Sequence, residues 1–142
     1  MKTLVHYAGN DFFIAISPGG HAQVLETNSQ RKSAPSPVDL LLSAVGACSG
    51  ADVVSILAKK RQKVTDYRNE VTAERREEFP KSFKTFHIHH VVRGHQVSEA
   101  AVAQAVELSD TKYCGVAASL RPTAEITSSF EIIEEPEDAA AV

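Results

Sequence analysis

Two cysteines, Cys48 and Cys114, offer the clearest chemistry in this 142-residue chain. A thiolate can attack the O–O bond of a peroxide, become a sulfenic acid and condense with a second thiol to a disulfide. That reaction needs one activated and one resolving thiol, and the count of two cysteines fits this need. Two cysteines are too few for a disulfide framework, and their separation excludes a CxxC motif. The alternative interpretation is that each cysteine is a small apolar residue in a tight core.

Peroxide chemistry requires the attacking thiol to be ionised. A free thiol has a pKa of about 8.5, and lowering it to about 6 takes about 3.4 kcal/mol of selective stabilisation. Asp52, one helical turn after Cys48, has the wrong charge for this task. The candidate activating cations are Arg31 and Lys32, in the loop before the helix, although both could be solvated loop charges. At Cys114, a following helix N-terminus and Lys112 are expected to favour the thiolate.

Cys48 lies in a predicted helix that begins at Ser36-Pro37-Val38-Asp39 and ends near Gln62. Serine is a favoured cap, proline suits the first helical position, and an early acid complements the helix dipole. The helix is apolar nearly all round, which predicts burial on most sides and, in so small a protein, a homodimer. Gly46 and Gly50 each cost about 1 kcal/mol relative to alanine. They indicate that a partner helix or a substrate approaches the backbone closely.

The remaining pattern predicts strands, a second helix and a short turn or helix containing Cys114. A helix is expected to begin at Ser98, and strands are expected over residues 3–8, 12–17, 21–26, 66–78, 83–93 and 123–133. This order predicts one α+β domain over residues 1–133, with a long buried central helix packed on an antiparallel sheet. Residues 134–142 are acidic and alanine-rich, and a flexible tail is expected there.

Charge and hydropathy narrow the function classes. The net charge is −3, and outside the acidic tail 15 basic residues face 14 acidic ones, so no nucleic-acid or anionic-membrane partner is indicated. No stretch is expected to approach the ~18 uncharged apolar residues of a membrane span. The first residues do not resemble a signal peptide, so a cytoplasmic location is expected. His87, His89 and His90 are interpreted as surface strand histidines, and no metal or cofactor is expected.

The segment from Ser36 to Cys48 and its continuation through Leu57, together with Lys112-Tyr113-Cys114, resembles the OsmC/Ohr family and is most similar to its YhfA-like branch. The resemblance covers residues 3–133 and implies an OsmC-like fold in an intertwined homodimer. It implies that Cys48 is the peroxidatic and Cys114 the resolving cysteine of a peroxiredoxin-like cycle that reduces organic hydroperoxides. A dithiol, in some relatives a lipoylated protein, would recycle the disulfide.

Two positions differ from the hydroperoxide-reducing branches of that family. Those branches place an arginine in the first hairpin, where this chain has Gly9-Asn10-Asp11, and a glutamate ten residues before the helix cysteine, where it has Val38. With its two cysteines in place, the sequence still favours a thiol-dependent hydroperoxide reductase. The two differences leave two alternatives open. One is a thiol redox sensor in a stress response, and the other is a non-enzymatic binder of a small hydrophobic ligand.

Overall fold

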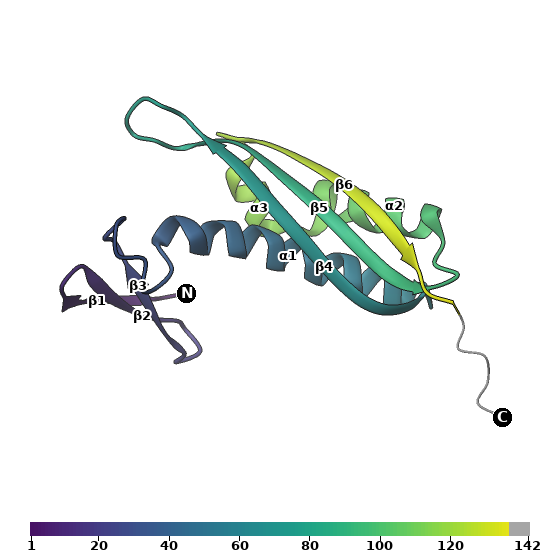
Figure 1. Ribbon diagram of the computed structural model, residues 1–142, viewed down its shortest axis with the longest axis horizontal. Helices are drawn as coiled ribbons and strands as arrows, with labels where there is room; N and C mark the ends of the chain where they lie inside the picture. The colour runs from purple at the N-terminus through teal and green to yellow at the C-terminus, as the bar shows by residue number, and fades with distance from the viewer. Residues whose placement is uncertain (137–142) are drawn as a thin grey trace. The chain divides into compact units, whose positions relative to one another are not determined.

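The computed structural model describes residues 1–136, and the chain divides into two compact units at Ser43 and Ala44 (Figure 1). That residues 1–133 form one domain stays a prediction. Of the expected tail, residues 137–142 lie outside the described residues. Glu134 and Glu135 are held in place, because the last strand includes Glu134 and the Glu135 carboxylate accepts a 2.7 Å hydrogen bond from Thr65.

The first unit contains a three-stranded antiparallel sheet in the order β1-β2-β3. Asn10 and Asp11 connect the first two strands with positive φ angles of 50° and 65°, as a tight hairpin turn requires. The three strands predicted here from the sequence are confirmed, with the bounds β1 Leu4–Gly9, β2 Phe12–Ile16 and β3 Ala22–Glu26.

Glu26, at the end of β3, organises the loop that leads to the first helix. Its side chain is nearly inaccessible, at 2% exposure, and accepts hydrogen bonds from the Ser33 and Ala34 amides at 2.5 and 3.2 Å. The Arg31 guanidinium forms an ion pair with the same carboxylate. A buried carboxylate is stable only with such partners. The sequence analysis missed this residue, because nothing local marks Glu26 as buried.

We expect Glu26→Ala to lower the free energy of unfolding by about 2 kcal/mol, because hydrogen bonds to a buried charge contribute about 1.5–3 kcal/mol. Urea unfolding followed by circular dichroism measures the change. Glu125→Ala is the control, since Glu125 is exposed on a strand of the second unit. Equal stability of the two variants would contradict the role given to Glu26.

The long helix α1 (Pro37–Lys59) begins as the sequence predicts. The Ser36 hydroxyl accepts a hydrogen bond from the Asp39 amide at 3.1 Å, and the Asp39 carboxylate accepts one from the Ser36 amide at 2.8 Å. These reciprocal bonds form a capping box. The hydrogen bonds that the Ser36 amide and hydroxyl donate to the Asp39 carboxylate lower the pKa of Asp39, with a smaller contribution from Lys32. The start of the helix is therefore fixed by local side chains alone.

The second unit packs helices on one face of a three-stranded sheet in the order β4-β5-β6 (Figure 1). Strands β4 and β5 are antiparallel, but β6 runs parallel to β5, which corrects the expectation of a purely antiparallel sheet. The chain reaches β6 through the helical segment between the strands. The bounds are β4 Lys63–Arg75, β5 Phe83–His95, α2 Glu99–Leu108, the π-helical turn η1 Ser109–Tyr113, α3 Gly115–Leu120 and β6 Glu125–Glu134.

The core of this unit lies where α1, β5 and α2 meet. Its residues are apolar and mostly inaccessible: Val53, Leu57, Val92, Val97, Ala101, Val102, Ala105 and Val106. Strand β5 alternates as predicted, with Phe86, Ile88 and Val92 facing the helices. His90 shares that face and is fully buried, so its interpretation as a surface histidine is wrong. His87 and His89 point to the other face, where both bond to Ser129.

Gly46 and Gly50 allow strand β4 to approach α1 closely. A Cβ atom at Gly46 would lie 2.8 Å from the Asn69 side-chain oxygen, and one at Gly50 would lie 3.0 Å from the Tyr67 ring. Asn69 also donates a 2.8 Å hydrogen bond to the Gly46 carbonyl. The close neighbour that the glycines indicated is therefore a strand of the same chain, rather than a partner helix or a substrate.

Helix α1 is less buried than the sequence predicts. It is long and apolar enough to cross a membrane by length and composition, which corrects the expectation that no stretch approaches that limit, and 33% of its most apolar stretch is buried. The same length and composition occur in core helices of soluble proteins, and the packing of α1 against β4 favours that assignment. A cytoplasmic location stays a prediction. An apolar stripe remains exposed along the helix, formed by Ala47, Ala51, Val54 and Ala58.

Candidate active site

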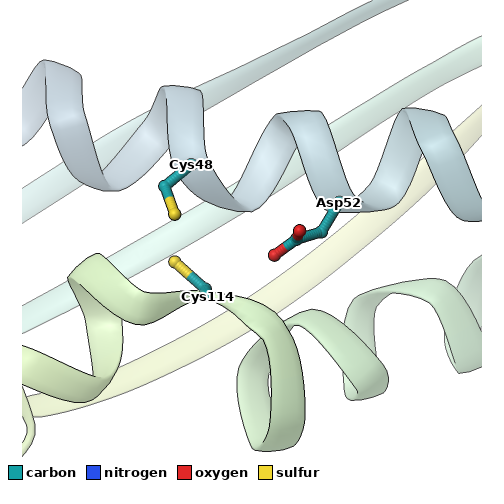
Figure 2. A group of neighbouring side chains, drawn as sticks. All are labelled: Cys48, Asp52 and Cys114. Carbon is teal, nitrogen blue, oxygen red and sulfur yellow. The ribbon is translucent and has the colours of Figure 1, made fainter.

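The second unit brings the two cysteines together. Cys48 lies in the middle of α1, and Cys114 lies between η1 and α3, with the two sulfur atoms facing one another (Figure 2). The Asp52 carboxylate lies beside them, and the three donor atoms are all within 4.8 Å of one another. Both cysteines are free. Because a disulfide has an S–S distance of about 2.05 Å, the sulfur atoms need to approach by no more than about 2.8 Å.

The π-helical turn η1 positions Cys114 through contacts at both of its sides. The buried Ser109 hydroxyl lies 3.1 Å from that of Ser49 on α1 and donates a 3.0 Å hydrogen bond to Asp52. The Asp110 carboxylate accepts a 3.0 Å hydrogen bond from Ser128 on β6. A π-helical turn is rare and is often found at functional sites. The two serines that connect α1 to η1 were missed in the sequence, because no motif relates positions 60 residues apart.

Cys114 is the more protected of the two thiols. It is 4% exposed, whereas Cys48 is half-buried. Burial raises the pKa of Cys114 to about 11, and Cys48 and Asp52 raise it further. The 3.4 Å hydrogen bond that the Ala117 amide donates to the sulfur lowers the pKa, but by less than burial raises it. The expectation that the helix N-terminus and Lys112 favour a thiolate here is therefore wrong. Loss of hydration outweighs one weak amide contact.

The two candidate cations belong to the first unit, and each has a carboxylate of its own there. The Arg31 guanidinium pairs with Glu26, lies 4.6 Å from the centre of the Phe12 ring and bonds to the Asn10 carbonyl. Lys32 acts electrostatically on Asp39. In the part of the chain that the structure describes, Asp52 forms no ion pair. The cation that would activate Cys48 stays a prediction.

Cys114 lines a pocket of about 380 Å³ that gives this side of the site a route to solvent. The pocket is formed by η1, the start of α3 and Arg121, whose guanidinium donates a 2.8 Å hydrogen bond to the Asp110 carbonyl. Cys114 is thus buried against α1 and borders a space large enough for a small reactant. The arrangement can therefore support attack by one thiol, closure of a disulfide and later access by a reductant.

Comparison with known proteins identifies the family. A family model described as an OsmC-like protein matches residues 29–129. The chain belongs to the OsmC-like family. Protein YhfA of Escherichia coli strain K12 is 44% identical over 133 residues, which cover 94% of this chain and 98% of YhfA. The resemblance to the YhfA-like branch is therefore confirmed.

Solved structures of other proteins share the fold. The crystal structure of a hypothetical protein from Aquifex aeolicus VF5 has 32% identity and a TM-score of 0.84, covering 95% of this chain and 97% of its own. The organic hydroperoxide resistance protein OhrB of Bacillus subtilis has 13% identity and a TM-score of 0.61, covering 92% of this chain and 96% of its own. The α+β fold of this OsmC-like chain is therefore established, whereas its dimeric state stays a prediction.

Proposed function

We propose that this OsmC-like protein reduces organic hydroperoxides with Cys48 as the attacking thiol and Cys114 as the resolving thiol. The observation that carries the proposal is the approach of two free sulfur atoms, from segments far apart in the sequence, to within 4.8 Å. The roles follow from exposure, since Cys48 is the more accessible of the two. The fold shared with organic hydroperoxide resistance proteins supports the substrate class.

The proposed cycle conserves atoms and electrons. The Cys48 thiolate attacks the O–O bond, and with one proton the products are an alcohol and Cys48 sulfenic acid. The Cys114 thiol then displaces water and forms the disulfide. A small dithiol reduces the disulfide by exchange, which restores both thiols and leaves the dithiol oxidised. The pocket that adjoins Cys114 gives this reductant its approach.

We propose Arg31, rather than Lys32, as the activating cation. Its guanidinium is fixed at three points and bonds to the first hairpin turn, which is where the hydroperoxide-reducing branches carry their arginine. We expect Arg31→Ala to slow the reaction of Cys48 with hydroperoxide and Lys32→Ala to leave it unchanged. Stopped-flow oxidation of the reduced protein measures both rates, and unchanged oxidation of Arg31→Ala would contradict the assignment.

The proposal includes a homodimer that covers the exposed stripe of α1. Val54 in this stripe is 43% exposed, and a second copy presents a stripe of the same small apolar residues. Burial of such a stripe against its copy removes apolar surface from water.

We expect light scattering to give twice the 15.4 kDa mass of one chain. Ala51→Lys places a charge in the stripe and is expected to weaken the dimer at least about 10-fold, since an unpaired buried charge is costly. Ala103→Lys is the matched control, because Ala103 is exposed on α2. A monomeric wild-type protein would refute the dimer.

Steady-state assays test the function directly. The reduced protein is expected to consume tert-butyl hydroperoxide catalytically with dihydrolipoamide, and to require both cysteines. Loss of thiols once per chain without turnover would instead support a redox sensor. Equal slow consumption by wild type and cysteine variants would favour a hydrophobic-ligand binder, which could use the pocket beside the stripe, of about 410 Å³.

A further inference from the structure

The cluster of Cys48, Asp52 and Cys114 also has the composition of a metal site. It combines two sulfur donors with one carboxylate, and all three donor atoms lie within 4.8 Å of one another (Figure 2). Zinc takes thiolate and carboxylate ligands together, and a tetrahedral site with Zn–S bonds of about 2.3 Å needs sulfur atoms about 3.8 Å apart. The sulfur atoms therefore need to approach by no more than about 1 Å.

The surroundings of Asp52 support a ligand role for its carboxylate. One carboxylate oxygen accepts the 3.0 Å hydrogen bond from Ser109, and Ser109 is itself buried and held by Ser49. This bond fixes the orientation of the carboxylate, as outer hydrogen bonds do for metal ligands. The other oxygen has no hydrogen-bond partner within residues 1–136. Ser109 thus acts as a positioning residue.

The donor set distinguishes zinc from other common metals. Mg²⁺ and Ca²⁺ prefer oxygen ligands only, and Cu⁺ prefers sulfur ligands only. Three protein ligands leave a fourth tetrahedral position, which water can fill. A pocket of about 380 Å³ borders the cluster at Cys114. The chemistry and the geometry thus agree on one divalent, thiophilic ion.

We propose that the reduced protein binds one Zn²⁺ per chain through Cys48, Asp52 and Cys114, and that disulfide formation releases it. Binding displaces one proton from each thiol. One hydroperoxide and two protons then convert the zinc-bound dithiolate into the disulfide, an alcohol, water and free Zn²⁺. The release step rests on the proposed function, whereas the binding step does not. Bound zinc would hold both sulfur atoms and slow the reaction with peroxide.

The binding step is tested by titrating the reduced, metal-free protein with Zn²⁺ against a chromogenic chelator. One ion per chain is expected, with at least about 100-fold weaker binding by Cys48→Ser and by Cys114→Ser. Asp52→Asn is expected to weaken binding at least about 10-fold, as loss of even an outer partner can. Glu107→Gln, an exposed carboxylate on α2, is the matched control. With Co²⁺ as a probe, thiolate-to-metal absorption should appear in the wild type and vanish in the cysteine variants.

Equal zinc affinity of the wild type, Cys48→Ser and Asp52→Asn would overturn the site. The release step is tested by adding one equivalent of tert-butyl hydroperoxide to the zinc-loaded protein, which should free one Zn²⁺ per chain. Retention of zinc while peroxide remains unreacted would overturn the release step alone, because the proposed function concerns the free thiols and is tested on the metal-free protein. Disulfide formation in a protein that never binds zinc would overturn the site alone.

Discussion

Cys48→Ser is expected to lower the rate of hydroperoxide consumption at least about 100-fold, because the hydroxyl that replaces the thiol is a far weaker nucleophile at neutral pH. Cys48 is half-buried in the middle of α1, with its sulfur facing Cys114. No other thiol is available, since the chain contains two cysteines and the second is 4% exposed. The measurement is peroxide consumption with dihydrolipoamide in excess.

Cys114→Ser separates the two roles. This variant keeps the attacking thiol, so one rapid oxidation per chain is expected, followed by failure of dithiol-dependent turnover. Cys48→Ser should show neither phase. Ser119→Ala, an exposed change on the same short helix α3, is a control that should retain wild-type turnover. Faster initial oxidation of Cys48→Ser than of Cys114→Ser would reverse the assignment of the two cysteines.

The second large effect that we expect is a loss of folding stability at acidic pH. His90 is fully buried on β5, and burial lowers its pKa to about 4, helped by charge repulsion from His89 and His87. Its Nδ1 atom lies 2.6 Å from the Tyr67 hydroxyl, and its Nε2 atom has no partner among the described residues. Burial raises the pKa of Tyr67 to about 12, so the hydroxyl keeps its proton and can donate a hydrogen bond to Nδ1.

A folded-state pKa below that of the unfolded chain gives stability that acid removes. Between pH 6.5 and pH 4 the unfolded chain binds a proton at residue 90 and the folded chain does not. The free energy of unfolding should therefore fall by about 3 kcal/mol between pH 7 and pH 4 on account of this residue. Urea unfolding at a series of pH values measures the fall.

His90→Gln should reduce that fall, since the amide does not titrate and can still accept the Tyr67 hydrogen bond. His87→Gln is the matched control, because His87 lies on the outer face of the same strand. We expect His87→Gln to keep most of the acid sensitivity of the wild type, because His87 makes the smallest contribution to the lowered pKa of His90. The same pH dependence in all three proteins would show that His90 is not the group responsible.

The sequence predicts most elements of this fold because their signals are local. Ser36, Pro37 and Asp39 define the start of α1, and the alternation along residues 83–93 identifies β5. The parallel direction of β6 could not be predicted, because it depends on how distant segments pack, whereas the burial of His90 was missed. His90 shares a face with Phe86 and Ile88, and that alternation was the available signal for its burial.

The candidate site was predicted in part. The pairing of Cys48 with Cys114 was expected from the family resemblance, whereas Ser49 and Ser109, which connect their two segments, carry no motif. The sequence places Asp52 one helical turn after Cys48, and this position predicts that its negative charge opposes ionisation of the thiol. The raised pKa of Cys114 opposes what its position before a helix indicates, because burial depends on the tertiary structure.

The central claim is that Cys48 and Cys114 of one chain form a disulfide on reaction with a hydroperoxide. It is tested most directly by treating the reduced protein with one equivalent of tert-butyl hydroperoxide and digesting it for mass spectrometry under non-reducing conditions. We expect the loss of both thiols and one crosslinked peptide pair joining Cys48 to Cys114, formed within a single chain at low protein concentration. Both thiols left free, or a disulfide that joins two chains, would contradict the claim.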